Sequence, residues 1–168
     1  MFDHFTEGAR EAIMQAQAEA VARSDEHIGG EHLLLGVLHE GTGVAADLLG
    51  DAGVTADAAR RAVGELHGPP PAVEPAAALA AIGIDLERVD ARLTEAFGPA
   101  ATAPKPTPFD DAGKEALMAA VTAADGRPIG TEHVLLGLLG APGAAATKLL
   151  EHLGVDVGAL TERARGWS

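Results

Sequence analysis

The sequence predicts an all-α protein of two pseudo-symmetric four-helix repeats, with an inserted helix pair between them. Three observations support this fold class. An 11-residue stretch occurs twice, and apolar residues recur at helical spacing. In each repeat, the third helix ends at a glycine that is followed by an aliphatic residue and then by a residue that can cap the next helix, which is called the glycine, aliphatic, cap pattern below. The duplicated stretch spans residues 28–38 and 129–139, with eight of eleven positions identical. Two such copies at one constant offset indicate an internal duplication.

Each copy of this stretch predicts a short, nearly all-apolar helix entered through glycine. Leucine and valine at consecutive positions leave no wide polar face, a pattern typical of a helix packed on several sides. Gly36 and Gly137 weaken such a helix by about 1 kcal/mol relative to alanine, so their recurrence predicts that another backbone passes close by. Glu31 and Glu132 fall in the first turn, where free amides and the helix dipole favour a carboxylate.

The first repeat covers residues 1–67. Thr6 can cap a helix that runs to about Arg23, and apolar residues keep the 3.6-residue period along it. After the central helix, residues 44–52 form a third helix that ends at Gly53, in the place of a left-handed cap. Thr55 then caps a fourth helix over residues 56–66.

The second repeat, residues 109–168, follows the same plan, with helices over 111–124, 129–139, 144–153 and from Asp156 to about Gly166. Between the repeats, residues 68–108 form two proline-rich linkers around a segment, residues 79–89, that repeats the glycine, aliphatic, cap pattern at Gly83. This insertion predicts two further helices, which makes ten helices in all and no strands.

Composition narrows the class of protein. The 168 residues can bury roughly 70% of their unfolded surface without metal or disulfide support. The absence of cysteine excludes disulfides and thiolate catalysis and fits a reducing compartment. The net charge of −13 disfavours a nucleic-acid partner and favours cationic partners, although most of the surplus carboxylates are explained by solubility alone. Because no apolar run approaches about 18 residues and no secretory signal is visible, we expect a soluble, cytoplasmic protein without a membrane partner.

Several parts of the sequence together resemble the Clp N-terminal repeat domain, which begins the ClpC and ClpA type unfoldases. The resemblance covers nearly the whole chain except residues 69–105, and it is carried by Met1, Phe2, Phe5, Thr6, Glu7, the two copies of the duplicated stretch, Gly41, Gly43, Val44, Ala45, Ala46 and Gly53. It implies a non-catalytic module that recruits adaptors and damaged substrates to the unfoldase ring. Because no GxxxxGK[ST] string occurs here, we expect a stand-alone Clp N domain without the ATPase motor.

The resemblance also implies a ligand site. Glu31 and Glu132 match the glutamates that hold the guanidinium of phosphoarginine in ClpC domains, and a carboxylate can bind a guanidinium through two parallel charge-assisted bonds. Thr6 matches the phosphate side of that site. The alternative interpretation is that both glutamates only complement the start of a helix.

The phosphate side departs from the family pattern. The counterpart of Thr6 in the second repeat is Asp110, and the arginines common two residues further on are replaced by Gly8 and Ala112. Because an aspartate repels a phosphate dianion, phosphoarginine binding is expected to be weakened in the second repeat more than in the first.

A second ligand surface is implied by Phe2, Phe109 and Lys114, which match positions where actinobacterial ClpC domains bind antibiotic cyclic peptides. Exposed aromatic side chains in an aromatic-poor chain can anchor an apolar ligand. The alternative is that Phe2 and Phe109 close the interface between the repeats as core residues.

The duplicated histidines, His32 and His133, are most simply residues that hydrogen-bond the backbone at a helix start. A metal site would have to combine His32 with His39 and Glu40, and the spacing offers no further ligand, so we expect neither metal nor cofactor. No nucleophile stands next to a histidine base in a known motif, and no G-x-S-x-G string occurs, so we do not expect an enzyme.

Three hypotheses of function follow. In the first, the protein binds peptide or protein segments, arginine-phosphorylated ones among them, or adaptors and regulators of a ClpC-type unfoldase. In the second, it protects the cell by sequestering cyclic peptide antibiotics. In the third, it is a structural partner that docks onto the unfoldase through the insertion at residues 75–97.

Overall fold

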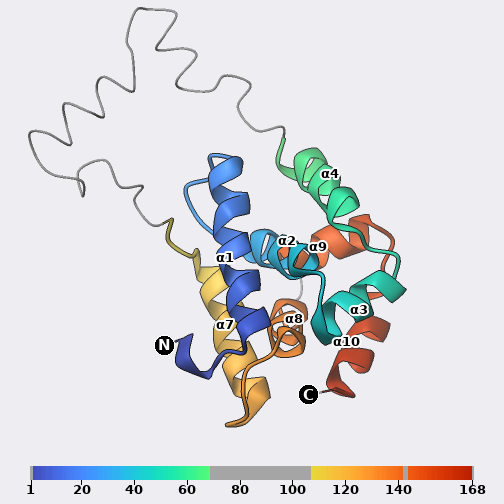
Figure 1. Ribbon diagram of the computed structural model, residues 1–168. Coiled ribbons are helices and arrows are strands. Elements are labelled where there is room, and N and C mark those ends of the chain that lie inside the picture. Colours follow the sequence, from blue (N-terminus) through green and yellow to red (C-terminus); the bar gives the residue numbers. More distant parts are fainter. Residues whose placement is uncertain (1, 69–106, 142–143, 168) are drawn as a thin grey trace, which may run out of the picture. The chain divides into compact units, whose positions relative to one another are not determined.

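The computed structural model describes residues 2–68, 107–141 and 144–167 of the 168-residue chain (Figure 1). The described parts of residues 1–68 and 107–168 group into one compact unit. The predicted helix pair of the insertion lies outside the described residues, and so does the total of ten helices that depends on it.

The described unit is all-α. In the first repeat, the 3-10 turn η1 (Phe2–His4) precedes α1 (Glu7–Ala22), α2 (Gly30–Glu40), α3 (Gly43–Asp51) and α4 (Ala56–His67). The second repeat consists of α7 (Asp111–Ala124), α8 (Thr131–Leu139), α9 (Ala145–His152) and α10 (Val157–Arg165). Two isolated β-bridges are the extended pairings in the described residues. The predicted fold class, with four helices in each repeat, is confirmed.

The helix boundaries follow from the caps that the sequence predicts. The side chains of Thr6, Thr55 and Asp156 each accept a hydrogen bond from the amide three residues further on, at the starts of α1, α4 and α10. Gly53 and Gly154 both adopt a φ of +78°, the left-handed conformation that ends α3 and α9 at low cost. Local sequence signals therefore define most of the ends.

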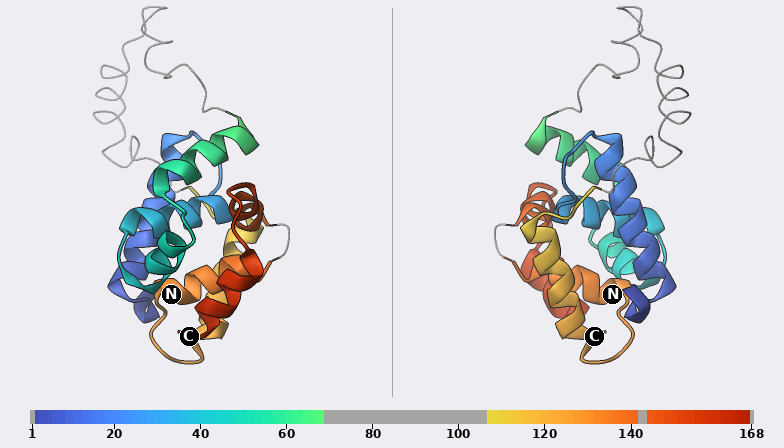
Figure 2. Two further views of the ribbon diagram at one scale, coloured as in Figure 1. Left: turned by 90° about the vertical axis from the view of Figure 1, so that its right-hand side faces the viewer. Right: turned by 90° about the vertical axis from the view of Figure 1, so that its left-hand side faces the viewer.

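The two central helices lie between two outer layers. α1 and α7 cover one side of α2 and α8, and α3, α4, α9 and α10 cover the other (Figures 1 and 2). Because α2 and α8 are covered from both sides, their leucines are removed from water, and Leu33, Leu34 and Leu135 have no exposed surface. The predicted centre of each repeat is confirmed.

A glycine allows the closest helix crossing in each repeat. A methyl group at Gly36 of α2 would lie 2.0 Å from the carbonyl oxygen of Ala12 in α1, and a methyl group at Gly137 of α8 would lie 2.0 Å from that of Ala116 in α7. Both alanines are buried. The sequence prediction that a second backbone passes each glycine is confirmed, and the crossing brings the backbones closer than any side chain would permit.

The two repeats interlock through equivalent contacts. α3 packs on α8, just as α9 packs on α2, and α4 contacts α9, just as α10 contacts α3. Ion pairs support the outer contacts: Glu65 Oε2 lies 2.7 Å from His152 Nε2, and Asp51 Oδ2 lies 2.6 Å from Arg163 Nη2. The two repeats therefore form one helical unit.

Among the described helices, none is by itself long and apolar enough to cross a membrane. α2 and α3 reach the required length and composition only together, and the chain bends by 96° between them. Burial of α2 inside the unit accounts for its apolar character.

Gly36→Ala tests the close crossing. We expect the free energy of unfolding to fall by about 1–3 kcal/mol or more, because the added methyl group forces two backbones apart. Urea denaturation of the full chain measures this loss. Gly50→Ala is the matched control, since nothing lies within 4 Å of its added methyl group in α3. It should stabilise the protein by up to about 1 kcal/mol, and equal effects of the two substitutions would contradict the role given to Gly36.

Candidate functional site

Two short backbone pairings bring the start of each repeat against the central motif of the other. Phe5 forms a parallel bridge with Ile129, and Phe109 forms the equivalent bridge with Ile28. The Thr6 N–H donates to the Ile129 carbonyl at 2.9 Å, and the Ile129 N–H donates to the His4 carbonyl at 2.8 Å. The start of α1 is therefore joined to the entry of α8.

The second pairing repeats this arrangement. The Ile28 N–H donates to the Pro108 carbonyl at 2.8 Å, and the Asp110 N–H donates to the Ile28 carbonyl at 3.1 Å. This joins the start of α7 to the entry of α2. Each predicted ligand site consequently combines residues of both repeats.

The glutamates of the first turn fold back over the glycine that precedes their helix. A methyl group at Gly29 would lie 2.5 Å from a carboxylate oxygen of Glu31, and a methyl group at Gly130 would lie 2.3 Å from those of Glu132. The glutamate side chains are only 14% and 19% exposed. These glycines, whose φ angles of −95° and −89° suit any residue, provide space for the carboxylates.

The duplicated histidines hold the backbone at the same two helix starts. The Gly29 N–H donates to His32 Nδ1, and the Gly130 N–H donates to His133 Nδ1, each at 3.0 Å. Both side chains are buried. The prediction that these histidines hydrogen-bond neighbouring backbone is confirmed.

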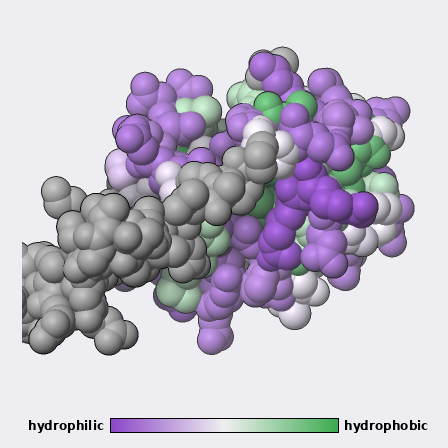
Figure 3. Space-filling model, turned by 90° about the horizontal axis from the view of Figure 1, so that it is seen from above, coloured by the Kyte–Doolittle hydropathy of each residue, from purple (hydrophilic) through white to green (hydrophobic). Residues whose placement is uncertain are grey.

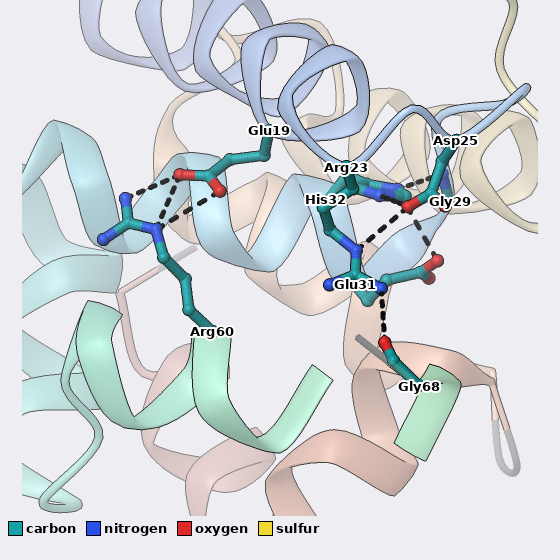
Figure 4. A network of polar contacts seen from close by, with 8 residues as sticks. All are labelled: Glu19, Arg23, Asp25, Gly29, Glu31, His32, Arg60 and Gly68. Atoms are coloured by element: carbon teal, nitrogen blue, oxygen red, sulfur yellow. Dashed lines mark hydrogen bonds and ion pairs between the residues drawn. The ribbon is translucent and has the colours of Figure 1, made fainter. Parts of the chain in front are cut away.

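The outer nitrogen of His32 has a partner that the sequence analysis missed. Asp25 Oδ2 lies 2.9 Å from His32 Nε2 and accepts a hydrogen bond from Arg23 Nε at 3.1 Å (Figure 4). Arg23 also donates to the Gly68 carbonyl at 3.2 Å. The signal in the sequence would have been the charged pair Arg23 and Asp25 before the central helix, with Asp25 seven residues ahead of the histidine.

At the starts of α1 and α7, where the family would bind the phosphate, this chain has carboxylates of its own, Glu40 beside α1 and Asp110 at α7. Thr6 Oγ1 accepts from the Ala9 amide at 3.3 Å, and Asp110 Oδ1 accepts from the Gly113 amide at 2.6 Å. A methyl group at Gly8 would lie 3.1 Å from Glu40 Oε1, so the Glu40 carboxylate lies over the first turn of α1.

Glu40 is held in this place by Thr42. Its carboxylate accepts from the Thr42 amide at 3.2 Å and from the Thr42 hydroxyl. The arginine that the family pattern puts at position 8 is thus replaced by a fixed negative charge.

The backbone bridges bring Thr6 to the entry of α8, which carries Glu132, and Asp110 to the entry of α2, which carries Glu31. Glu40, at the far end of α2, lies against the start of α1, so the roughly 15 Å length of α2 separates Thr6 from Glu31. The sequence analysis treated Thr6 and Glu31 as parts of one repeat, and only the backbone bridges reveal the crossed pairing.

The residues predicted for the second ligand surface lie partly together. Phe109 and Lys114 line one pocket of about 290 Å³, whose other lining residues are His27, Pro108, Asp110 and Asp111. Phe109 is half-buried and packs against the core, and its backbone pairs with Ile28, so it also has the core role considered as the alternative. Phe2 lies in η1, and its side chain is outside the described part.

A second polar contact, absent from the sequence analysis, fastens α4 to α1. Arg60 donates two hydrogen bonds to Glu19 Oε1, at 2.6 and 3.0 Å, and Arg60 Nη2 lies 3.2 Å from His39 Nδ1 (Figure 4). The hydrogen bonds to Glu19 raise the pKa of Arg60 above its ordinary value, and partial burial opposes this. His39 therefore faces a guanidinium, and in the described residues no three potential metal ligands are grouped.

One face of the molecule is mainly hydrophilic. Seen from above, apolar side chains occur only in small groups among polar ones (Figure 3). With a net charge of −13 and a carboxylate at both helix starts of each site, the arrangement can bind a cationic group but opposes an anion.

The fold, with candidate sites that combine residues of both repeats, defines an all-α repeat module. Comparisons with known proteins place the chain in the same class. Residues 4–89 match the family described as the Clp repeat (R) N-terminal domain. The chain belongs to this family. The solved N-terminal domain of the chaperone ClpD from Arabidopsis thaliana covers 99% of this chain with a TM-score of 0.69 at 26% identity, and 99% of that domain is covered in turn.

Curated relatives match over most of this chain. A probable ATP-dependent Clp protease ATP-binding subunit of Chlamydia pneumoniae is 32% identical over 93% of the chain, and the chloroplastic chaperone protein ClpC3 of Oryza sativa subsp. japonica is 34% identical over 88%. The chain spans only 16% and 13% of these relatives. The similarity covers their non-catalytic N-terminal domain.

Gly130→Ala tests whether the Glu132 carboxylate can be displaced without unfolding. The alanine backbone is allowed, so the methyl group should push the flexible carboxylate aside and cost about 1 kcal/mol of stability, in part from the poorer N-cap. Urea denaturation and the side-chain carboxyl ¹³C shift of Glu132 measure the two effects. Gly137→Ala, seven residues on, should cost clearly more, and a similar loss for both would show that Gly130 is packed rather than covered by a movable group.

Proposed function

We propose that this protein is a binding module that takes up peptide or protein segments carrying arginine, and that it serves a ClpC-type unfoldase system as a recruiter or regulator of substrates and adaptors. The proposal is carried by one observation: two equivalent glutamates, Glu31 and Glu132, present carboxylates at the starts of the central helices, next to residues of the opposite repeat. Membership of the Clp N-terminal repeat family supports a binding role of this kind.

The chemistry of the glutamates suits a guanidinium. Each carboxylate is mostly buried, so it has lost part of its hydration and gains more from a charge-assisted pair than a free surface glutamate does. Arginine offers a planar fork of donors, whereas lysine offers a single strongly hydrated charge. A preference for arginine over lysine follows.

The phosphate side favours unmodified arginine. Glu40 lies over the start of α1 beside Thr6, and Asp110 caps α7. A phosphate group at either place would meet a carboxylate at short range, which costs binding energy. We therefore expect phosphorylation of the arginine to weaken binding.

Fluorescence anisotropy with three labelled peptides tests this function. The peptides differ in one central residue, which is arginine, lysine or phosphoarginine, and the arginine peptide should bind best. Glu132→Gln should weaken its binding about tenfold, because a charge-assisted hydrogen bond contributes about 1.5–3 kcal/mol. Glu31→Gln should have a similar effect at the other site.

Glu65→Gln is the control, because Glu65 pairs with His152 on α9, away from both sites. It should leave binding unchanged. If the three peptides bind equally well, or if neither Glu31→Gln nor Glu132→Gln alters the affinity, the proposed function is wrong.

A second candidate function is sequestration of cyclic peptide antibiotics. The pocket of about 290 Å³ lined by Phe109 and Lys114 favours it, because such a pocket can hold an apolar side chain next to a polar one.

Calorimetry with a ClpC-targeting cyclic peptide tests the second candidate. Tight binding is expected for the full chain, with a clear loss for Lys114→Ala and for Phe109→Leu, which keeps most of the packing. Met118→Ala is the control, because Met118 is 69% exposed on the same helix and does not line the pocket. No heat at micromolar peptide would rule out sequestration.

A further inference from the structure

The buried ring of His32 is bonded on both sides. Its Nε2 lies 2.9 Å from Asp25 Oδ2, and its Nδ1 accepts the Gly29 N–H at 3.0 Å. The His32 side chain is 2% exposed, whereas the Asp25 side chain is 39% exposed. Asp25 also accepts from Arg23 Nε at 3.1 Å, and Arg23 Nη2 donates to the Gly68 carbonyl (Figure 4). A continuous chain of polar contacts therefore runs from the end of α4 to the start of α2.

The two bonds of the ring fix the position of its proton. Because Nδ1 accepts the Gly29 N–H, its lone pair is in use and it carries no proton. In neutral imidazole the proton then lies on Nε2, since the bond made by one ring nitrogen sets the state of the other. His32 Nε2–H consequently donates to the Asp25 carboxylate, which gives this buried donor the acceptor that it needs.

The state of Nδ1 matters for the neighbouring Glu31, the glutamate proposed to bind arginine. Glu31 Oε1 lies 3.5 Å from His32 Nδ1, and the Glu31 side chain is 14% exposed. While Nδ1 carries no proton, the ring offers no donor to this carboxylate, and its lone pairs stay available to a guanidinium. A proton on Nδ1 would make the ring a donor to Glu31, in competition with the ligand.

The second repeat lacks the carboxylate on the outer nitrogen. By its distance from the duplicated stretch, the counterpart of Asp25 is Gly126, which has no side chain. His133 Nε2 has no hydrogen-bond partner among the described residues. Glu132 Oε1 lies 3.0 Å from His133 Nδ1, nearer than the 3.5 Å of the first repeat. The glutamate is thus closer to the ring in the repeat whose ring has no acceptor on its outer side.

We propose that Asp25 is a positioning residue of the Glu31 site. By accepting the Nε2 proton of His32, it keeps Nδ1 unprotonated and leaves the Glu31 carboxylate free to bind arginine. Arg23 holds the Asp25 carboxylate in place through the bond from Nε. Asp25 acts only through the availability of Glu31, so its role rests on the function proposed above.

Fluorescence anisotropy of the full chain tests this role in a Glu132→Gln background, which leaves the first site alone. The arginine and lysine peptides described above are the probes, and loss of arginine binding on adding Glu31→Gln shows that the remaining affinity comes from Glu31. Asp25→Ala removes the acceptor, so arginine affinity should fall several-fold. Asp25→Asn is the matched control, because its carbonyl oxygen can still accept from Nε2–H, and it should retain most of the affinity.

Histidine ring ¹⁵N NMR of the same chains gives a readout that a general loss of packing would not produce. The His32 pattern should show the proton on Nε2 in the unaltered chain and in Asp25→Asn, and on Nδ1 in Asp25→Ala. Amide spectra show whether Asp25→Ala is folded. If it is not, Asp25→Gly, which copies the second repeat, takes its place, and the ring pattern of the unaltered chain is decisive by itself.

Three results would overturn the role of Asp25 and leave the proposed function intact. The first is a proton on Nδ1 of His32 in the unaltered chain. The second is an arginine affinity that Asp25→Ala does not change. The third is an equal loss for Asp25→Ala and Asp25→Asn, which would show that the charge of Asp25 matters and not its acceptor. Equal binding of the arginine and lysine peptides to the Glu132→Gln chain would instead refute the proposed function itself.

Discussion

The close crossing of α1 over α2 at Gly36, repeated by α7 over α8 at Gly137, is the constraint on which the rest of the structure depends. A carbonyl oxygen lies 2.0 Å from the place of a missing methyl group at each crossing. Since no other residue fits, the crossing point is fixed to one helical turn. With α1 and α7 covering one side of the central helices, the remaining helices can cover only the other side, and two layers of small and branched side chains complete the core.

The same crossing explains why the candidate sites are shared between repeats. In each repeat the first two helices run in opposite directions, so the glutamate at the start of the central helix lies far from the start of the first helix. The bridges of Phe5 with Ile129 and of Phe109 with Ile28 bring in the missing half from the other repeat. A single repeat therefore contains only half of each candidate site.

Sequence reasoning predicted what local signals determine. Thr6, Thr55 and Gly53 define helix ends through bonds within a few residues, and the recurrence of Gly36 and Gly137 showed that a backbone passes there. It could not predict the place of Thr6 at the entry of α8 or the contact of Arg60 with Glu19, because these depend on how helices distant in sequence cross. The Asp25 to His32 contact was missed for a different reason: the second repeat has no counterpart of Asp25 that would have marked it as a pattern.

The two repeats have kept their apolar framework and lost their polar equivalence. Gly36 and Gly137 are identical, since any change there would move a backbone, and the buried Leu33 and Val37 are replaced only by other apolar residues, Val134 and Leu138. Positions that bond to solvent-facing partners have diverged: Arg60 and Glu19 correspond to Thr161 and Ala123, and Asp25 corresponds to Gly126. In the first repeat His32 Nε2 meets Asp25, whereas the buried His133 Nε2 of the second has no hydrogen-bond partner among the described residues. A symmetric scaffold with unequal polar groups therefore presents two chemically different surfaces at its two equivalent helix starts.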